Sequence, residues 1–119
     1  MSDQATITRL QLPADSRVSM KIEINTDVHI SAFVARQKAN RFLILYAGDQ
    51  LAGGEPELQI DQELNWRVPV QFAPSRRGVL GIVGHLLINA NTGEVILADS
   101  LTIEDLLQRA ETLYERAPL

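Results

Sequence analysis

The fold is decided by residues 66–72, Trp66-Arg67-Val68-Pro69-Val70-Gln71-Phe72, and by residues 88–96, Ile88-Asn89-Ala90-Asn91-Thr92-Gly93-Glu94-Val95-Ile96. In the first stretch Trp66, Val68, Val70 and Phe72 share one face, as in a strand buried on one side. In the second, Asn91-Thr92-Gly93 fits a three-residue hairpin loop with glycine in the left-handed position, and the chain returns through residues 94–97. Both stretches predict antiparallel strands, and neither contains a catalytic signature.

Pro69 restricts where the first of these strands can lie, because proline has no amide hydrogen to donate to a sheet. We therefore expect residues 66–72 to form an edge strand, or Pro69 to face outward at a bulge. The apolar segment 79–90 that follows reads as the next strand, and Gly81 and Gly84 within it indicate a bend or bulge. A shorter strand is expected at residues 57–60.

A helix is predicted from Ser31 to about residue 50, because apolar residues recur there at intervals of three or four. Ser31 is the expected N-cap. The run Ala52-Gly53-Gly54-Glu55-Pro56 offers glycines for a left-handed exit and a proline that cannot extend the helix. The apolar positions of this helix are Ala35, Ala39, Phe42, Leu43 and Tyr46.

A second amphipathic helix is predicted over residues 102–117. Thr102 followed by Asp105 approximates a capping box, with Asp in place of the usual Glu. Every residue between the positions of its apolar stripe is polar or charged. The stripe consists of Ile103, Leu106, Leu107, Ala110, Leu113, Tyr114 and Ala117.

The N-terminal part of the chain predicts a hairpin over residues 6–25. Residues 17–25 alternate strictly between apolar and polar, and residues 6–12 are apolar enough to pair with them. With 119 residues, the chain has the usual length of one domain, so we expect a single domain over 1–119. The predicted fold class is α+β: an antiparallel sheet packed by two amphipathic helices, with an N-terminal hairpin.

Composition narrows the classes of function. With 11 basic and 15 acidic residues the net charge is -4, which gives no general attraction to nucleic acid. The chain has no cysteine, its start lacks the pattern of a signal peptide, and its apolar runs are far too short to span a bilayer. We therefore expect a cytoplasmic protein without membrane or nucleic-acid partners.

Candidate catalytic and metal-binding residues are few. His29 and His85 are the only histidines, and neither has ligand spacing around it. No serine lies in a nucleophile elbow, and the segment 78–84 lacks the order of a phosphate-binding loop. The sequence thus favours a non-catalytic protein without metal or cofactor. A pocket that gathered His85, Arg67 and nearby carboxylates would instead indicate a small-ligand enzyme.

Five residues are candidates for contact with a partner. Arg67 lies on the polar face of its strand, Arg76 and Arg77 lie in the following loop, and His85 interrupts an apolar strand. Each could meet an acidic partner or a carboxylate, although solvated loop charges are more common. Trp66 fits either the core or the rim of an interface.

The order of helix, Trp-Arg-Val-Pro-Val strand and Ile-Asn-Ala-Asn-Thr-Gly-Glu-Val-Ile hairpin resembles the PepSY domain over residues 31–97. It is also similar to a group of small uncharacterised bacterial proteins with the same Trp-Arg-Val-Pro-Val and Thr-Gly-Glu arrangement. The resemblance implies a non-catalytic module that binds or inhibits other proteins, often peptidases, and is usually exported or membrane-attached. Asn89 stands where the PepSY family tends to have Asp, and an export signal is missing.

Two hypotheses for function follow. The first is a cytoplasmic protein-binding or assembly module of unknown partner that forms a homodimer, since edge strands pair readily with another chain. The alternative is an antitoxin-like transcriptional regulator that dimerises and contacts DNA through the hairpin at residues 6–25. Only three cations, Arg9, Arg17 and Lys21, lie in residues 1–30 to support the alternative.

Overall fold

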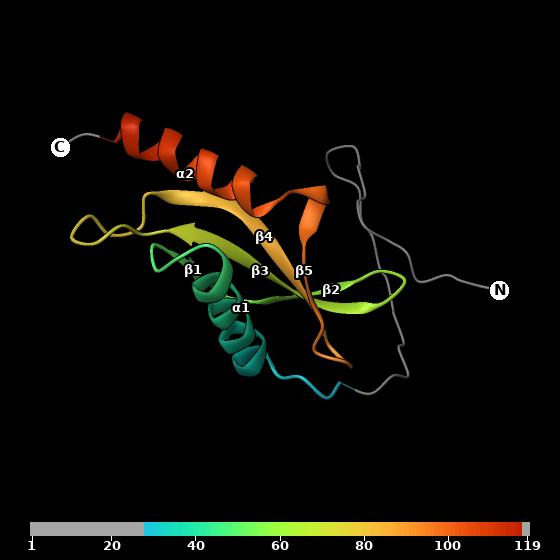
Figure 1. The fold of residues 1–119 in the computed structure, drawn as a ribbon. Helices are drawn as coiled ribbons and strands as arrows, with labels where there is room; N and C mark the ends of the chain where they lie inside the picture. Colours follow the sequence, from blue (N-terminus) through green and yellow to red (C-terminus); the bar gives the residue numbers. More distant parts are fainter. Residues whose placement is uncertain (1–27, 118–119) are drawn as a thin grey trace, which may run out of the picture.

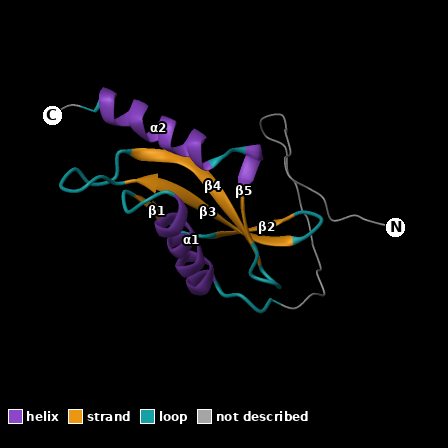
Figure 2. Ribbon diagram, in the orientation of Figure 1, coloured by secondary structure: helices purple, strands orange, loops and turns teal. Residues whose placement is uncertain are grey.

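The computed structural model describes residues 28–117, and the hairpin predicted over residues 6–25 lies outside them. The described chain folds into an antiparallel sheet with two α-helices (Figures 1 and 2), which confirms the predicted α+β class. Its elements, in order, are α1 (Ala32–Tyr46), β1 (Leu51–Gly53), β2 (Glu57–Ile60), β3 (Leu64–Phe72), β4 (Gly81–Asn89), β5 (Val95–Leu97), a short 3-10 helix η1 (Ala98–Ser100) and α2 (Ile103–Arg116).

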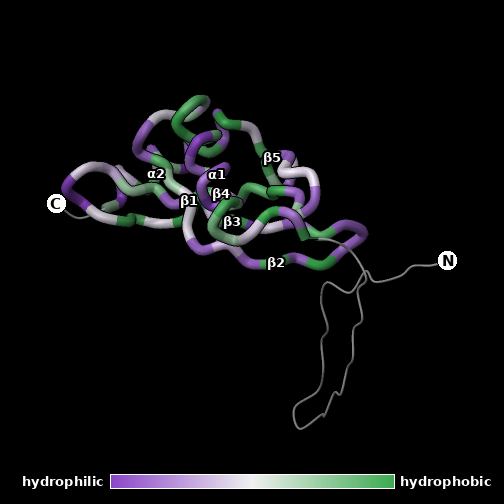
Figure 3. The backbone as a smooth tube through the Cα atoms, turned by 90° about the horizontal axis from the view of Figure 1, so that it is seen from below, coloured by the Kyte–Doolittle hydropathy of each residue, from purple (hydrophilic) through white to green (hydrophobic). Residues whose placement is uncertain are grey.

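The sheet is built around β3. Strand β4 pairs with one side of β3, and β5 continues the sheet beyond β4. On the other side of β3, the two short strands β1 and β2 pair with different parts of its length. The alternation of apolar and polar residues along β3 can be followed in Figure 3. This alternation gives β3 one apolar side that faces the core and one side that carries Arg67, Pro69 and Gln71.

Pro69 does not mark an edge strand, so that alternative was wrong. It lies in the central strand, opposite His85 of β4. Its carbonyl accepts a hydrogen bond from Gly54 N at 2.8 Å, in the connection between β1 and β2. A strand residue directs its N and its carbonyl to the same side, so the missing amide hydrogen faces this break between two short strands. Pro69 also lies on the face away from the core, as its intermediate burial between buried Val68 and Val70 indicates.

The predicted irregularity in the segment 79–90 is present. Val70 pairs with Gly84 and Gln71 with Ile82, so the register skips Val83 and β4 carries a bulge. Strand β4 is shorter than the predicted segment, because pairing begins only at Gly81.

The Asn91-Thr92-Gly93 loop joins β4 to β5 as predicted. Gly93 has a φ of 80°, in the left-handed region. The side-chain oxygen of Asn89 accepts hydrogen bonds from the amides of Asn91 and Thr92, both at 2.9 Å. These bonds fix the loop from the side chain that precedes it.

Helix α1 begins as predicted and ends earlier. The Ser31 hydroxyl oxygen accepts from Val34 N at 3.1 Å. The helix stops at Tyr46, and Gly48, with a φ of 101°, turns the chain out of it. The prediction that the helix continues to about residue 50 and exits at residues 52–56 is therefore wrong, since an earlier glycine provides the left-handed position.

Gly53 lies in β1, close beneath α1. A Cβ at this position would lie 3.3 Å from Ala39 Cβ and 3.1 Å from Val68 Cγ1. Its amide donates to Asn40 Oδ1 at 2.7 Å, and its carbonyl accepts from Arg36 Nε at 3.0 Å. Two side chains of α1 thus occupy the amide and the carbonyl that Gly53 would offer to another chain at this edge.

Helix α2 has the predicted capping box. Thr102 Oγ1 accepts from Asp105 N at 3.1 Å, and the Asp105 carboxylate accepts from Thr102 N at 2.9 Å. The helix extends to Arg116, one residue short of the predicted end. These two bonds satisfy amides at the helix start that would otherwise lack a partner.

The core lies between the sheet and both helices, which cover the same face. Gly53 meets α1, while Gly81 and Gly84 of β4 meet Leu113 and Leu106 of α2. Within residues 28–117, no helix is long and apolar enough to cross a membrane. The largest fully buried side chains are Leu43, Leu86, Ile88, Leu106, Val68, Val70 and Val83.

Candidate functional site

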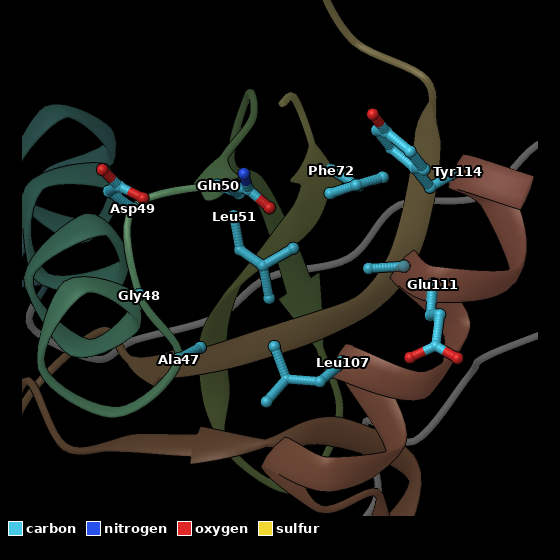
Figure 4. A pocket seen from close by; sticks show the side chains of 10 residues that line it. Ala47, Gly48, Asp49, Gln50, Leu51, Phe72, Leu107, Glu111 and Tyr114 are labelled. Carbon is cyan, nitrogen blue, oxygen red and sulfur yellow. The ribbon is translucent and has the colours of Figure 1, made fainter. Parts of the chain in front are cut away.

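A hollow with a volume of about 540 Å³ lies between the end of α1 and the length of α2 (Figure 4). We call it the interhelical groove. Its base is the end of the sheet where β1 pairs with β3. It is lined by Ala47, Gly48, Asp49, Gln50, Leu51, Phe72, Leu107, Ala110, Glu111 and Tyr114.

The floor of the interhelical groove is apolar. Leu51 and Phe72 pair with each other in the register of β1 and β3, and both are buried. The turn at Gly48 brings the chain from α1 into β1, so Leu51 is placed directly beside the helix end. The position of this floor follows from the early termination of α1.

One wall of the interhelical groove is a flank of α2. Leu107 is 43% exposed and Tyr114 is 50% exposed, and both line the groove. The Tyr114 ring also contacts the floor, since its centroid lies 6.4 Å from that of Phe72. The guanidinium of Arg77 stacks over Tyr114 at 4.7 Å from the ring centroid. Half-exposed apolar side chains above a buried floor are typical of a surface that contacts other molecules.

The sequence-predicted residues Arg67 and His85 come together elsewhere, on the sheet face away from the helices. Arg67 forms an ion pair with Asp99 at 3.3 Å, with 30% of the Arg67 side chain exposed. Asp99 and Ser100 both adopt left-handed conformations, with φ of 61° and 59°. Burial lowers the pKa of His85 from its usual 6.5, and the positive charge of Arg67 lowers it further. The cluster therefore favours a neutral imidazole beside a paired guanidinium.

The other predicted interaction residues do not join this cluster. Trp66 is half-buried against the core, and its indole N–H donates to the Ile30 carbonyl at 2.6 Å. This bond gives Trp66 a structural role that links the start of α1 to the sheet. Arg76 is exposed in the β3–β4 loop with a φ of 71°, whereas Arg77 lies beside the interhelical groove through Tyr114.

His29 and His85 lie on different parts of the fold. His29 lies where the chain enters α1, and its backbone amide donates to the Ala90 carbonyl at 2.9 Å. In the described part of the chain, no group of three or more His, Asp or Glu residues could hold a metal ion. Neither His85 nor Arg67 lines the interhelical groove.

Sequence reasoning missed the interhelical groove itself. Its lining comes from three places in the chain: residues 47–51, Phe72 and α2. The available signal was on α2, where Glu104, Glu111 and Glu115 fall on the same flank as Leu107 and Tyr114, since each residue turns a helix by about 100°. Apolar residues outside the buried stripe, flanked by charges of one sign, indicate a surface rather than a core.

Comparison with protein-family models, curated proteins and solved structures gave no match to this chain.

Proposed function

We propose that the protein is a non-catalytic protein-binding module, and that the interhelical groove receives a segment of its partner. The observation that carries the proposal is the buried floor of Leu51 and Phe72 below the half-exposed Leu107 and Tyr114. A groove of about 540 Å³ that is open along its surface suits a few side chains of another chain.

Exposed apolar residues at the end of α1 support this proposal. Ile44, Leu45 and Tyr46 are 62%, 67% and 63% exposed, and they directly precede the groove residues Ala47 and Gly48. Three consecutive large apolar side chains in water are unfavourable unless another surface covers them. A partner seated in the groove could extend over this helix end.

The hydrogen bonds at Gly53 also favour the groove over strand addition at β1. Strand addition requires free amide and carbonyl groups on the edge strand. In β1 the amide and carbonyl of Gly53 are bonded to Asn40 and Arg36. A partner therefore gains more from side-chain contacts in the groove than from backbone pairing at this edge.

A second copy of the chain is one form that the partner can take, so homodimerisation belongs to the same proposal. The absence of cysteine fits a reducing compartment such as the cytoplasm. The resemblance to the PepSY domain supports the protein-binding part of the proposal, because it implies a non-catalytic module that binds other proteins.

The proposal is tested by site-specific photo-crosslinking in cells that express the full chain. A photoreactive amino acid replaces Leu107 in the groove, and the matched control replaces Thr112, an exposed residue on another flank of α2. We expect a discrete adduct at position 107 and none at position 112, and mass spectrometry then distinguishes another protein from a second copy. No adduct at either position, or equal adducts at both, would contradict the proposal.

A further inference from the structure

The two sides of the interhelical groove carry negative charge. Asp49 lies in the turn between α1 and β1, and Glu111 lies on α2. Figure 4 shows the side chains of Leu51 and Leu107 between these two carboxylates. Among the residues that the structure describes, neither carboxylate takes part in an ion pair. A molecule in the groove would thus meet apolar surface in the middle and an anion on either side.

Three of the four acidic residues of α2 fall on one flank of the helix, and the fourth, Asp105, falls on the opposite flank near Arg109. Glu104, Glu111 and Glu115 fall on the flank that also carries the groove residues Leu107 and Tyr114. The basic residues Arg109 and Arg116 fall on the opposite flank, and Arg109 donates to the Val83 carbonyl at 3.2 Å. The acidic flank is therefore not neutralised by the cations of its own helix.

The C-terminal end of α1 adds to the negative charge at the interhelical groove. Ala47 and Gly48 line the groove at the C-terminus of this helix, where the helix dipole places partial negative charge. The last turn of α1 contains no basic residue that would offset this charge. Arg77 lies at the Tyr114 end of the groove, where its guanidinium stacks over that ring, whereas Asp49 and Glu111 line the groove itself.

We infer that the partner segment in the interhelical groove is a basic peptide, with an apolar anchor residue between lysines or arginines. The anchor packs on Leu51, Phe72 and Leu107, while the flanking cations lie near Asp49 and Glu111. This inference rests on the proposed function and adds the chemical class of the partner. Complementary charge at the rim of an apolar contact gives orientation and speeds association.

The test measures binding of the full chain to a library of short fluorescent peptides. Each peptide has one varied apolar residue, flanked on both sides by lysine, by glutamate or by serine. We expect the best lysine-flanked peptide to bind about five-fold or more tightly than its serine-flanked counterpart, as two ion pairs of ~0.5 kcal/mol each would give. Added salt should reduce this preference.

Charge variants locate the effect. Glu111→Lys should abolish the preference for lysine-flanked peptides, and Asp49→Asn should weaken it. The control Glu94→Lys makes the same change in net charge in the β4–β5 hairpin and should leave the preference intact. Circular dichroism verifies that each variant folds. If Glu111→Lys does not fold, the peptide preference of Asp49→Asn alone tests the inference.

The outcomes separate the inference from the proposed function. A crosslink at position 107 combined with a preference for glutamate- or serine-flanked peptides, or no binding by any peptide, overturns the basic-peptide inference and leaves the binding module standing. Equal binding of free arginine amide and of the peptides would make the groove a small-cation site and would also overturn it. Loss of both the crosslink and peptide binding overturns both.

Discussion

The two helices cover the same sheet face by different means. Helix α1 contacts the sheet through the small residues Ala35 and Ala39 with Leu43, whereas α2 inserts Leu106 and Leu113 into positions where β4 has glycine. The first arrangement brings a helix backbone close to a flat part of the sheet. The second places large side chains into gaps in the strand surface.

The outer surfaces of the helices differ as well. Beyond its buried stripe, α2 carries mostly charged and polar residues, and it is the more strongly amphipathic of the two. Helix α1 exposes large apolar side chains as well, since Phe33, Ile44 and Leu45 are 62% to 70% exposed beside polar residues such as Arg41. The two helices thus differ in where their exposed apolar side chains lie: those of α2 line the interhelical groove, and Ile44 and Leu45 lie at the end of α1.

The largest expected effect concerns the large side chain at the centre of α2. Leu106→Ala should lower the free energy of unfolding by about 2–5 kcal/mol, because Leu106 is fully buried and its loss leaves a cavity over β4. Urea denaturation monitored by circular dichroism measures the change. As a control, Leu107→Ala removes a leucine that is 43% exposed and should have a clearly smaller effect. Equal losses would show that Leu106 does not hold α2 on the sheet.

Gly84 lies beneath α2, and the effect of replacing it on the free energy of unfolding should depend on whether Leu106 is present. A Cβ at Gly84 would overlap Leu106 Cδ2, so Gly84→Ala should destabilise the protein by about 1–3 kcal/mol. In the Leu106→Ala background the overlapping atom is gone, and the same substitution should be neutral or stabilising. A double-mutant cycle of unfolding free energies measures this coupling. Additive effects would contradict the insertion of Leu106 at Gly84.

The corresponding test for α1 addresses the hydrogen bonds that hold it to the sheet edge. Asn40→Ala removes the acceptor for Gly53 N and should cost about 1 kcal/mol, because the amide is left without a protein partner. Asn40→Asp keeps an acceptor and is the matched control. Asn40→Ala should also increase self-association in light scattering, since it frees part of an edge strand. Unchanged stability and unchanged association would contradict the role given to Asn40.

The smallest expected effect lies on the sheet face that neither helix covers. The pKa of His85 is lowered from 6.5, first by burial and then by Arg67, while Asp99 and Glu57 act in the opposite direction. The unfolded chain then binds a proton more readily than the folded one, so stability is lost as pH falls below about 6.5.

This loss is measured as the difference in unfolding free energy between about pH 7 and pH 5. His85→Gln should show a smaller difference than the unchanged protein. The pKa of Asp105 is also lowered, through its hydrogen bonds to Thr102, but from 3.8, so its contribution lies at more acid pH. A His85→Gln profile identical to that of the unchanged protein would contradict the lowered pKa.

Much of the fold could be predicted from local patterns. The caps at Ser31 and Thr102, the left-handed Gly93 and the alternation in β3 each depend on residues close in sequence. The end of α1 was misplaced because several glycines follow the helix, and local sequence does not say which of them adopts a positive φ. Gly48 does so, whereas Gly53 is required for close approach of Ala39 and Val68.

The candidate site was much less predictable, because its lining residues are distant in sequence. Leu51, Phe72 and Leu107 become neighbours only when β1 pairs with β3 and α2 packs beside them. Of the five residues predicted to contact a partner, Arg77 alone lies beside the interhelical groove. Sequence reasoning selected Trp66 and Arg67 for their chemistry, but the structure uses them for a hydrogen bond to Ile30 and an ion pair with Asp99.

Pro69 has a consequence for the evolution of this sheet. Pro69 has no amide hydrogen to donate to a neighbouring strand. For this reason β1 and β2 cannot join into one uninterrupted strand along β3. One long edge strand that could pair with another chain is thereby replaced by two short edge strands with a connection between them. Within that connection, residues 55–56 are the place where added residues would disturb the pairing of β3 least, and where related chains could acquire an insertion without losing the rest of the architecture.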